Sequence, residues 1–383
     1  MTLSLDILDR LIAFDTVSNR SNLDLISYIE DFLRARQFRL HRIPDLTEQK
    51  AGLYAEIGPQ TDGGILLSAH SDVVPVEGQA WTKPPFQLTR EGDQLFGRGT
   101  TDMKGFLAEM LAIADVASSK PLKAPLKLLI SYDEEIGCGG IDRMKDRLKP
   151  VLGRPDLAIV GEPTEMQVAI GHKGKRAYSA RMTGQAGHSA LAPRYVSALH
   201  IAVDFVAALR ALQDGLEQNG SRDDNYDIPY STIHVGRIRS GTALNIVPDS
   251  AEVQFELRHL AEEDPDLLER QIIEAANMVK APYAAHASIT LQPLAAYPGL
   301  AIPAMSAAVT SVQNWSGGPT CKVAFGTEAG FLSELGIPTV VCGPGSMADQ
   351  GHKPDEHICR TQLMKCAKML ARAVHHLTEP QGQ

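Results

Sequence analysis

The chain has 383 residues, which is enough for two domains of ordinary size and too many for one simple core. Hydrophobic residues make up 44% and charged residues 22%, which predicts a globular protein and excludes a disordered or fibrous one. The formal net charge of -9 leaves no basic surface broad enough to neutralise a phosphate backbone, so we expect no nucleic-acid partner.

The N-terminal segment and the cysteines favour a cytoplasmic protein. Residues 1–18 have the pattern of an amphipathic helix, and the charges of Asp6, Asp9 and Arg10 interrupt the apolar run that a signal peptide needs. No stretch approaches the ~20 apolar residues of a membrane span, so no membrane association is expected. The five cysteines are an odd number and none stands at CxxC spacing, which favours a reducing compartment.

Apolar strand-like runs alternate with helical patterns in the first part of the chain. Residues 65–69, 126–131 and 157–160 are predicted as strands, and residues 103–117 as a helix between the first two. This alternation favours an α/β domain with a mainly parallel central sheet flanked by helices. Each strand-like run ends in polar residues, which is where open α/β sheets bind their ligands.

From about residue 175 the pattern changes to that of half-buried antiparallel strands. A polar surface loop is expected over residues 213–227. The predicted elements are strands at residues 178–183, 230–237 and 251–257 and helices at residues 197–212 and 265–279. Together they predict an α+β sandwich inserted over residues 175–286.

After residue 287 the α/β pattern returns. The predicted elements are a strand at residues 288–292, a helix at 304–315, a strand at 339–342 and a closing helix at 361–377. The first domain is therefore expected to be discontinuous, comprising residues 1–174 and 287–383.

His70 and Asp72 follow the first predicted strand, and side chains at i and i+2 of an extended chain face the same way. An imidazole suits a borderline-soft divalent metal, and a nearby carboxylate can orient the ring. We interpret His70 as a metal ligand and Asp72 as the residue that orients it. A His-x-Asp pair also occurs by chance, so the pair alone does not establish a metal site.

Asp102 stands where a glycine-rich loop meets the predicted helix. The common role of such a residue is a helix N-cap. The density of glycines before it permits a close approach of the backbone to something other than solvent. Asp102 is therefore our candidate for a carboxylate that bridges two metals.

Three carboxylates, those of Asp133, Glu134 and Glu135, cluster at the end of the second predicted strand. Such a cluster is repulsive unless cations lie among its members, and a solvated acidic turn is the alternative. Adjacent side chains on an extended backbone diverge, so one of Glu134 and Glu135 is expected to be a ligand and the other a free carboxylate over the metal-bound water.

Glu162 follows the third predicted strand in the same way and would supply a terminal ligand. His352 lies in the last α/β stretch. Two histidines and three carboxylates at the ends of strands favour a site for two zinc ions over five separate accidents.

These motifs resemble those of the zinc-dependent amidohydrolase and peptidase family that includes acetylornithine deacetylase, succinyl-diaminopimelate desuccinylase and glutamate carboxypeptidase. The family's ordered pattern spans nearly the whole chain as His70 and Asp72, Asp102 to Gly105, Asp133 to Glu135, Glu162 and His352. The resemblance implies one zinc on His70, Asp102 and Glu162, the other on Asp102, Glu135 and His352, and Glu134 as general base. Cobalt or manganese can replace zinc with such ligands.

The resemblance also implies that the inserted domain is a lid and a dimerisation surface, and hence that the protein is a homodimer. His188, in the segment Gly187-His188-Ser189, matches a family histidine that stabilises the oxyanion, often in the neighbouring subunit. Without the resemblance, the residues alone favour a position in a surface turn for His188. Asn245 and Arg258 match positions that are linked to the substrate's carboxylate.

The segment Gly326-Thr327-Glu328-Ala329-Gly330 is closer to acetylornithine deacetylases than to desuccinylases. Glu328 could pair with the side-chain ammonium of ornithine, and a carboxylate at a helix N-terminus is an equal alternative. The implied reaction is hydrolysis of N2-acetyl-L-ornithine to L-ornithine and acetate. Desuccinylase, aminoacylase and dipeptidase are alternatives with the same chemistry, and a non-catalytic binding protein is one of another class.

Overall fold

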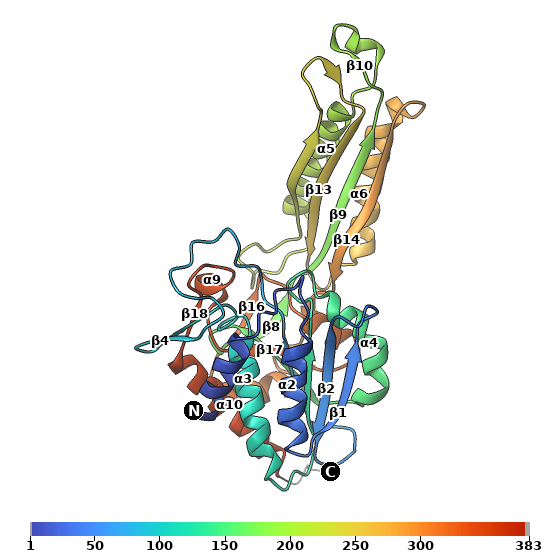
Figure 1. The fold of residues 1–383 in the computed structure, drawn as a ribbon. Helices are drawn as coiled ribbons and strands as arrows, with labels where there is room; N and C mark the ends of the chain where they lie inside the picture. Colours follow the sequence, from blue (N-terminus) through green and yellow to red (C-terminus); the bar gives the residue numbers. More distant parts are fainter. Residues whose placement is uncertain (1, 380–383) are drawn as a thin grey trace. The chain divides into compact units, whose positions relative to one another are not determined.

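The computed structural model describes residues 2–379, which form two compact units (Figure 1). The first unit comprises Met1–Gly171, Leu300–Val323 and Thr327–Gln383, and the second comprises His172–Gly299 and Ala324–Gly326. Met1 and residues 380–383, which the predicted boundaries include, lie outside the described residues. An insertion within a discontinuous first unit is present, as the sequence predicted.

A nine-stranded sheet runs through the described part of the first unit in the order β1-β2-β6-β3-β7-β17-β8-β15, with β16 beside β8. The four central strands β6, β3, β7 and β17 are parallel, whereas β1, β2 and β8 pair antiparallel. The strands are β1 (Arg39–Pro44), β2 (Ala51–Ile57), β3 (Ile65–His70), β6 (Leu126–Ser131), β7 (Leu157–Pro163), β8 (Val168–His172), β15 (Leu300–Ala301), β16 (Thr320–Val323) and β17 (Thr339–Gly343).

Helices cover both faces of this sheet, which is why β3, β6 and β7 are buried along their whole lengths. Five helices share one core with alternate strand residues such as Leu67 and Leu128. They are α1 (Thr2–Ile12), α2 (Leu23–Arg34), α3 (Lys104–Ser118), α7 (Ala307–Ser316) and α10 (Arg360–His376), of which Figure 1 shows α2 and α3 in front of the sheet. On the other face, α4 (Gly139–Leu152) contacts α8 (Ala329–Glu334).

Beside the main sheet, the first unit carries a short helix and a small sheet. Helix α9 (Met347–Gln350) follows β17. The small sheet has the order β18-β5-β4, formed by β18 (His357–Cys359), β5 (Gln94–Phe96) and β4 (Thr89–Glu91). No helix within residues 2–379 is both long enough and apolar enough to cross a bilayer.

The second unit is a four-stranded antiparallel sheet in the order β11-β13-β9-β14, with two helices on one face (Figure 1). Buried and half-buried residues alternate along β13, and Phe255 packs against Tyr178 and Phe205. Its elements are β9 (Gly174–Thr183), β10 (Gly187–His188), η1 (Ser189–Arg194), α5 (Ala198–Asn219), β11 (Thr232–Ser240), β12 (Ile246–Val247), β13 (Ser250–His259), α6 (Pro265–Lys280), η2 (Ala281–Tyr283) and β14 (Ser288–Tyr297).

The structure differs from the sequence prediction at the end of the insertion. The strand expected at residues 288–292 to return the chain to the first domain is β14, which pairs antiparallel with β9. The predicted boundary at residue 287 is therefore wrong, because an alternating strand fits either sheet and only its pairing partner decides. The predicted loop over residues 213–227 is also partly wrong, since α5 continues to Asn219.

Gly140 packs the start of α4 tightly against the end of β6. A Cβ added at Gly140 would lie 1.6 Å from the carbonyl oxygen of Tyr132, which precedes the acidic residues 133–135. Gly140→Ala should therefore displace α4 and lower the free energy of unfolding by about 1–3 kcal/mol, measured by urea unfolding.

The matched control is Gly215→Ala in α5, where nothing lies within 4 Å of an added Cβ. This change should stabilise the protein by about 0.5–1 kcal/mol, since alanine favours a helix. Equal stability of Gly140→Ala and wild type would contradict the packing described.

Candidate metal centre

The predicted site residues of the first unit gather where the parallel strands end. His70 is the last residue of β3, residues 133–135 follow β6, and Glu162 is the last residue but one of β7. His352 lies on the segment after β17, and Asp102 lies just before α3. Since β6, β3, β7 and β17 are adjacent and parallel, their carboxyl ends share one edge of the sheet.

Five side chains form two groups, each able to hold a cation, and Asp102 belongs to both. The groups are His70, Asp102 and Glu162, and Asp102, Glu135 and His352, with the ligand atoms of each within 4.8 Å of one another. His70 Nε2 lies 3.1 Å from Asp102 Oδ1, whereas His352 Nε2 lies 3.4 Å from Asp102 Oδ2. One oxygen of Asp102 therefore faces each group, as a bridging carboxylate requires.

Glu134 belongs to neither group, although its neighbour Glu135 lies 3.0 Å from His352 Nε2. Its Oε1 accepts a hydrogen bond from the thiol of Cys138 at 3.1 Å. The two adjacent glutamates therefore have different partners, but the backbone is not the extended one that the prediction assumed, since Asp133 has a positive φ and Glu135 lies in a turn. No sequence signal pointed to Cys138.

Asp72 connects His70 to the acidic loop. The ring Nδ1 of His70 lies 2.9 Å from the carbonyl oxygen of Asp72 and 3.5 Å from its Oδ1. The Asp72 carboxylate accepts hydrogen bonds from the backbone amides of Glu134 at 3.1 Å and Glu135 at 3.3 Å, and from the Ser18 hydroxyl at 2.7 Å. Asp72 thus holds the imidazole mainly through its backbone, while its carboxylate fixes the acidic loop, which the sequence did not indicate.

Burial and repulsion shift Glu135 and Glu162 towards their neutral forms, whereas the pKa of Asp102 stays below its usual range because hydrogen bonds with His352 and His70 outweigh the effect of burial. Burial raises the pKa of Glu162 well above its usual range, and the charge of Asp102 adds to the rise while His70 opposes it. Burial also raises the pKa of Glu135 to about 7, with a further contribution from Asp102. Hydrogen bonds to Asp102 and Glu135 raise the pKa of His352 to about 10.

The residues present fit a divalent cation in each group. Carboxylate oxygens and imidazole nitrogens are the donors that zinc, cobalt and manganese accept. Glu135 Oε1 is buried and has no hydrogen-bond partner among the described residues. A cation would satisfy that oxygen, relieve the repulsion between the carboxylates and displace their protons.

His188 and Asn245 lie close together in the second unit. His188, on β10, pairs with Ile246 of β12, and the amide of Ser189 donates to the carbonyl oxygen of Asn245 at 3.1 Å. His188 is exposed, and its Nδ1 accepts a hydrogen bond from the amide of Ala190 at 3.1 Å. This local contact is that of a turn residue whose Nε2 stays available.

Arg258 lies in the four-stranded sheet, at the end of β13 that is remote from the two-stranded sheet of β10 and β12. It pairs with Lys175, whereas Ser250, at the other end of β13, pairs with Thr183. The eight residue-to-residue steps from Ser250 to Arg258 extend over roughly 26 Å of strand. Arg258 donates to Tyr297 Oη at 2.7 Å and to Glu256 Oε1 at 3.0 Å. The second unit therefore does not bring Arg258 together with His188 and Asn245.

Glu328 is only 1% exposed and directly precedes α8. Burial raises its pKa to about 7, and the nearby Ser131 hydroxyl offsets part of this rise. Neither carboxylate oxygen has a well-aligned hydrogen-bond partner among the described residues, so the side chain does not cap the helix. This buried position gives no support to contact with a substrate ammonium and agrees with the alternative of a carboxylate at a helix N-terminus.

Comparisons with known proteins identify the family. The chain matches Peptidase family M20/M25/M40 over residues 66–376. It is 33% identical over 369 residues to acetylornithine deacetylase of Shigella sonnei, which covers 95% of this chain and 93% of that protein. The chain belongs to Peptidase family M20/M25/M40, which confirms the resemblance seen in its motifs. It is therefore an enzyme, a hydrolase of this family.

Solved structures share the fold. The M20 family metallo-carboxypeptidase Sso-CP2 of Sulfolobus solfataricus has a TM-score of 0.80 at 20% identity, with 99% of this chain and 100% of that chain covered. Aminopeptidase PepT of Bacillus cereus has a TM-score of 0.78 at 20% identity, with 99% of each chain covered. The YXEP protein of Bacillus subtilis, described as a dinuclear metal-binding peptidase, has a TM-score of 0.72 at 17% identity, with 98% of each covered. These similarities confirm the predicted fold class.

The metal-free protein should lose stability as the pH rises from about 5 to about 8. The ionised form of Glu135 destabilises the folded protein, because the pKa of this group is raised to about 7 in the folded state. The destabilisation is absent below the unfolded-state pKa and grows until the pH reaches the folded-state pKa. His352, raised to about 10, acts in the same direction, because its stabilising effect is complete below its unfolded pKa and is lost as the pH rises.

Melting of chelator-treated protein between pH 5 and 8.5 measures this dependence. Glu135→Gln should flatten it, and added zinc should raise Tm more at pH 8 than at pH 5.5. A zinc effect independent of pH, or a Tm that rises with pH, would contradict the electrostatics described.

Proposed function

We propose that this protein uses two divalent metal ions, zinc in the first instance, to hydrolyse N2-acetyl-L-ornithine to L-ornithine and acetate, a step of arginine biosynthesis. The observation that carries the proposal is that Asp102 offers one oxygen to each of two three-residue groups. The similarity to an acetylornithine deacetylase along 95% of the chain favours the acetylated substrate. The structural relative described as a dinuclear metal-binding peptidase favours two ions.

His70, Asp102 and Glu162 would hold one ion, and Asp102, Glu135 and His352 the other. When bound, the ions supply polarisation of the acyl carbonyl and a lowered pKa of the attacking water. Side chains of the protein would then provide proton transfer, stabilisation of the oxyanion and binding of the substrate's carboxylate.

Glu134, which lies outside both groups, accepts the proton of the attacking water and delivers it to the departing amine nitrogen. Burial holds its pKa well above the usual range, and the charges of Glu135 and Asp102 add to this while His70 opposes it. A carboxyl group whose pKa is raised in this way can carry a proton near neutral pH, as its second role requires.

His188 would stabilise the oxyanion, and Asn245 and Arg258 would bind the substrate's carboxylate. Arg258 lies roughly 26 Å along β13 from Ser250, the end that follows β12, and β12 pairs with the strand of His188, so one second unit is not expected to present both residues to a single substrate. This separation favours a homodimer through the inserted unit, in which His188 serves the site of the partner.

Desuccinylase, aminoacylase and dipeptidase activities need the same metal chemistry, and the solved relatives include a peptidase that acts as a carboxypeptidase. Because Glu328 is buried, a contact of its carboxylate with a substrate ammonium does not serve to distinguish these activities. The free thiols of all five cysteines agree with a reducing environment, so we place the protein in the cytoplasm.

Glu134→Ala should keep both zinc ions and lose about 10²–10⁴-fold in kcat, because it removes the proton acceptor without removing a ligand. The matched control is Glu274→Ala on the exposed face of α6, which should keep full activity. Kinetics and zinc content of the same preparations test this. Loss of zinc together with activity would undo the division between ligand and base.

Zinc-loaded enzyme should act on acetylornithine with a kcat/KM at least about tenfold above that for acetylcitrulline, succinyl-diaminopimelate and dipeptides. A higher value for any of the others would reassign the substrate within the same chemistry. Equal inertness of metal-free and zinc-loaded protein on all of them would favour the binding-protein alternative.

His188→Ala should lose about 10²–10³-fold in kcat through loss of the oxyanion contact. If His188 serves the partner's site, mixing the inactive His188→Ala and Glu134→Ala proteins under subunit exchange should restore about a quarter of wild-type activity. His200→Ala, an exposed histidine of α5, is the control and should stay active. Exchange without recovery would place His188 in its own subunit's site.

A further inference from the structure

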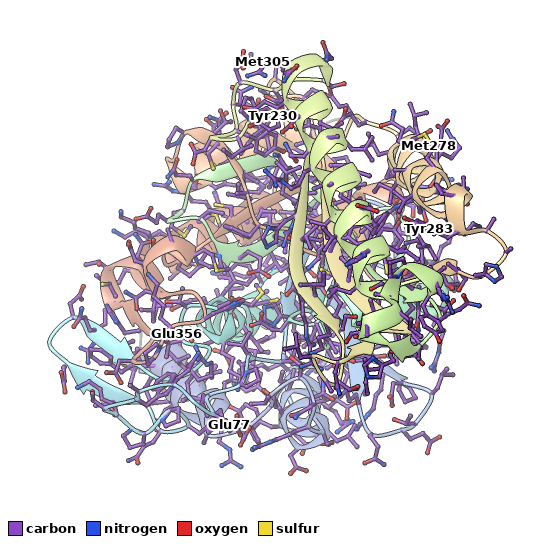
Figure 2. The ribbon with its side chains drawn as sticks, turned by 90° about the horizontal axis from the view of Figure 1, so that it is seen from above. Glu77, Tyr230, Met278, Tyr283, Met305 and Glu356 are labelled. Atoms are coloured by element: carbon purple, nitrogen blue, oxygen red, sulfur yellow. The ribbon has the colours of Figure 1, made fainter. Side chains whose placement is uncertain are left out.

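A buried ion pair lies beside the two candidate groups and belongs to neither of them. Arg98 and Glu356 are each 1% exposed, and Arg98 Nη1 lies 2.8 Å from Glu356 Oε2. Figure 2 labels Glu356 near the strands of the small sheet, where β18 follows it. Arg98 precedes the loop that carries Asp102, and Glu356 stands four residues after His352.

The Glu356 carboxylate also holds the backbone of the Asp102 loop. Its Oε1 accepts hydrogen bonds from the amides of Thr101 at 2.8 Å and Asp102 at 3.1 Å. Its Oε2 accepts one from the amide of Gly99 at 2.9 Å, besides the bond from Arg98. The two oxygens thus accept four hydrogen bonds. Three of these come from backbone amides of one loop, with Thr100 skipped, and they fix the backbone at the residue that is shared by both groups.

Arg98 extends this network to the segment that carries His352. Its Nη1 donates to the carbonyl oxygen of Lys353 at 3.2 Å, and its Nη2 donates to Gln79 Oε1. Gln79 Nε2 in turn donates to the carbonyl oxygen of His352 at 2.8 Å. The side chain of His352 is 54% exposed, so side-chain packing holds it weakly and these backbone contacts fix its segment.

We propose that Arg98, Glu356 and Gln79 are positioning residues that hold Asp102 and His352 at the spacing at which both can bind the same cation. The inference rests on the proposed dinuclear site, but it concerns affinity for the ion rather than the chemical step. Partners of metal ligands that fix their orientation typically change affinity or activity by about 10–100-fold.

The alternative is a buried ion pair that serves only the stability of the fold. A stability role predicts a lower Tm of the metal-free protein and an unchanged metal affinity. A positioning role predicts weaker binding of the ion of the Asp102, Glu135 and His352 group in a protein that is still folded. Metal affinity and Tm therefore distinguish the two.

Two variants probe the network from opposite ends. Glu356→Gln keeps the shape of the side chain but turns an amide NH₂ towards Arg98 and the Gly99 amide. Gln79→Leu removes the link to the His352 carbonyl together with the acceptor of Arg98 Nη2 and of Trp81 Nε1, and the fold should tolerate it because Gln79 is half-buried. Glu109→Gln is the control, since Glu109 is a carboxylate of α3 that is 3% exposed beside Ser4.

Chelator-treated protein is titrated with zinc against a chromophoric chelator, and Tm is recorded without metal. We expect both variants to bind the weaker zinc equivalent about 10–100-fold less tightly than wild type, and activity to return when zinc is in excess. Glu109→Gln should bind zinc as wild type does. Wild-type affinities in folded Glu356→Gln and Gln79→Leu would overturn the inference.

If Glu356→Gln does not fold, Gln79→Leu decides alone, because an unchanged zinc affinity in that variant overturns the inference. Wild-type protein that binds fewer than two equivalents would refute the proposed dinuclear site itself. Two equivalents in wild type with unchanged variants would refute only the positioning role.

Discussion

Asp102 places one carboxylate oxygen beside each of two imidazoles, and the rest of the site is built around this sharing. His70 and Glu162 lie on one side of it and Glu135 and His352 on the other. Burial raises the pKa of Glu135 to about 7, and repulsion by the nearby carboxylate of Asp102 adds to the rise. A cation in each group would turn this repulsion into attraction, so that folding of the site and metal binding would be coupled.

The fold positions these charged side chains through hydrogen bonds to the backbone of their loops more than through contacts with the ligand side chains themselves. The Asp72 carboxylate accepts hydrogen bonds from backbone amides of the acidic loop, and the Glu356 carboxylate accepts hydrogen bonds from backbone amides of the Asp102 loop. Both are buried carboxylates that do not belong to either ligand group. Asp72 thus links the end of β3 to the loop after β6, and Glu356 links the segment before β18 to the loop before α3.

The second unit contributes a different constraint. His188 and Asn245 lie at the two-stranded sheet of β10 and β12, which adjoins the Ser250 end of β13, and Arg258 lies near the other end of β13. A rigid sheet keeps these residues apart, so a substrate that contacts all of them has to meet two copies of the unit. The strand geometry itself therefore links the proposed catalysis to a homodimer.

Much of this arrangement follows from local patterns in the chain. The apolar runs that became β3, β6 and β7 are followed by His70, Glu135 and Glu162, and the helix predicted at residues 103–117 is α3 (Lys104–Ser118). Other expectations depended on pairing. The strand at residues 288–292 fitted either sheet by its alternation, and the burial of Glu328 before α8 does not decide between the two equal alternatives considered for it.

The sequence by itself determined the fold class and the order of the candidate ligands, because hydrophobic period and side-chain chemistry are local properties. Only the tertiary structure decided which strands pair, that Asp102 faces both groups, and that Ser18, Cys138, Arg98 and Glu356 support the site. The Arg98–Glu356 pair, for example, spans 258 residues. A hydrogen bond between residues so far apart in the sequence leaves no periodic pattern in the chain, since it depends on where the folded protein places two separate loops.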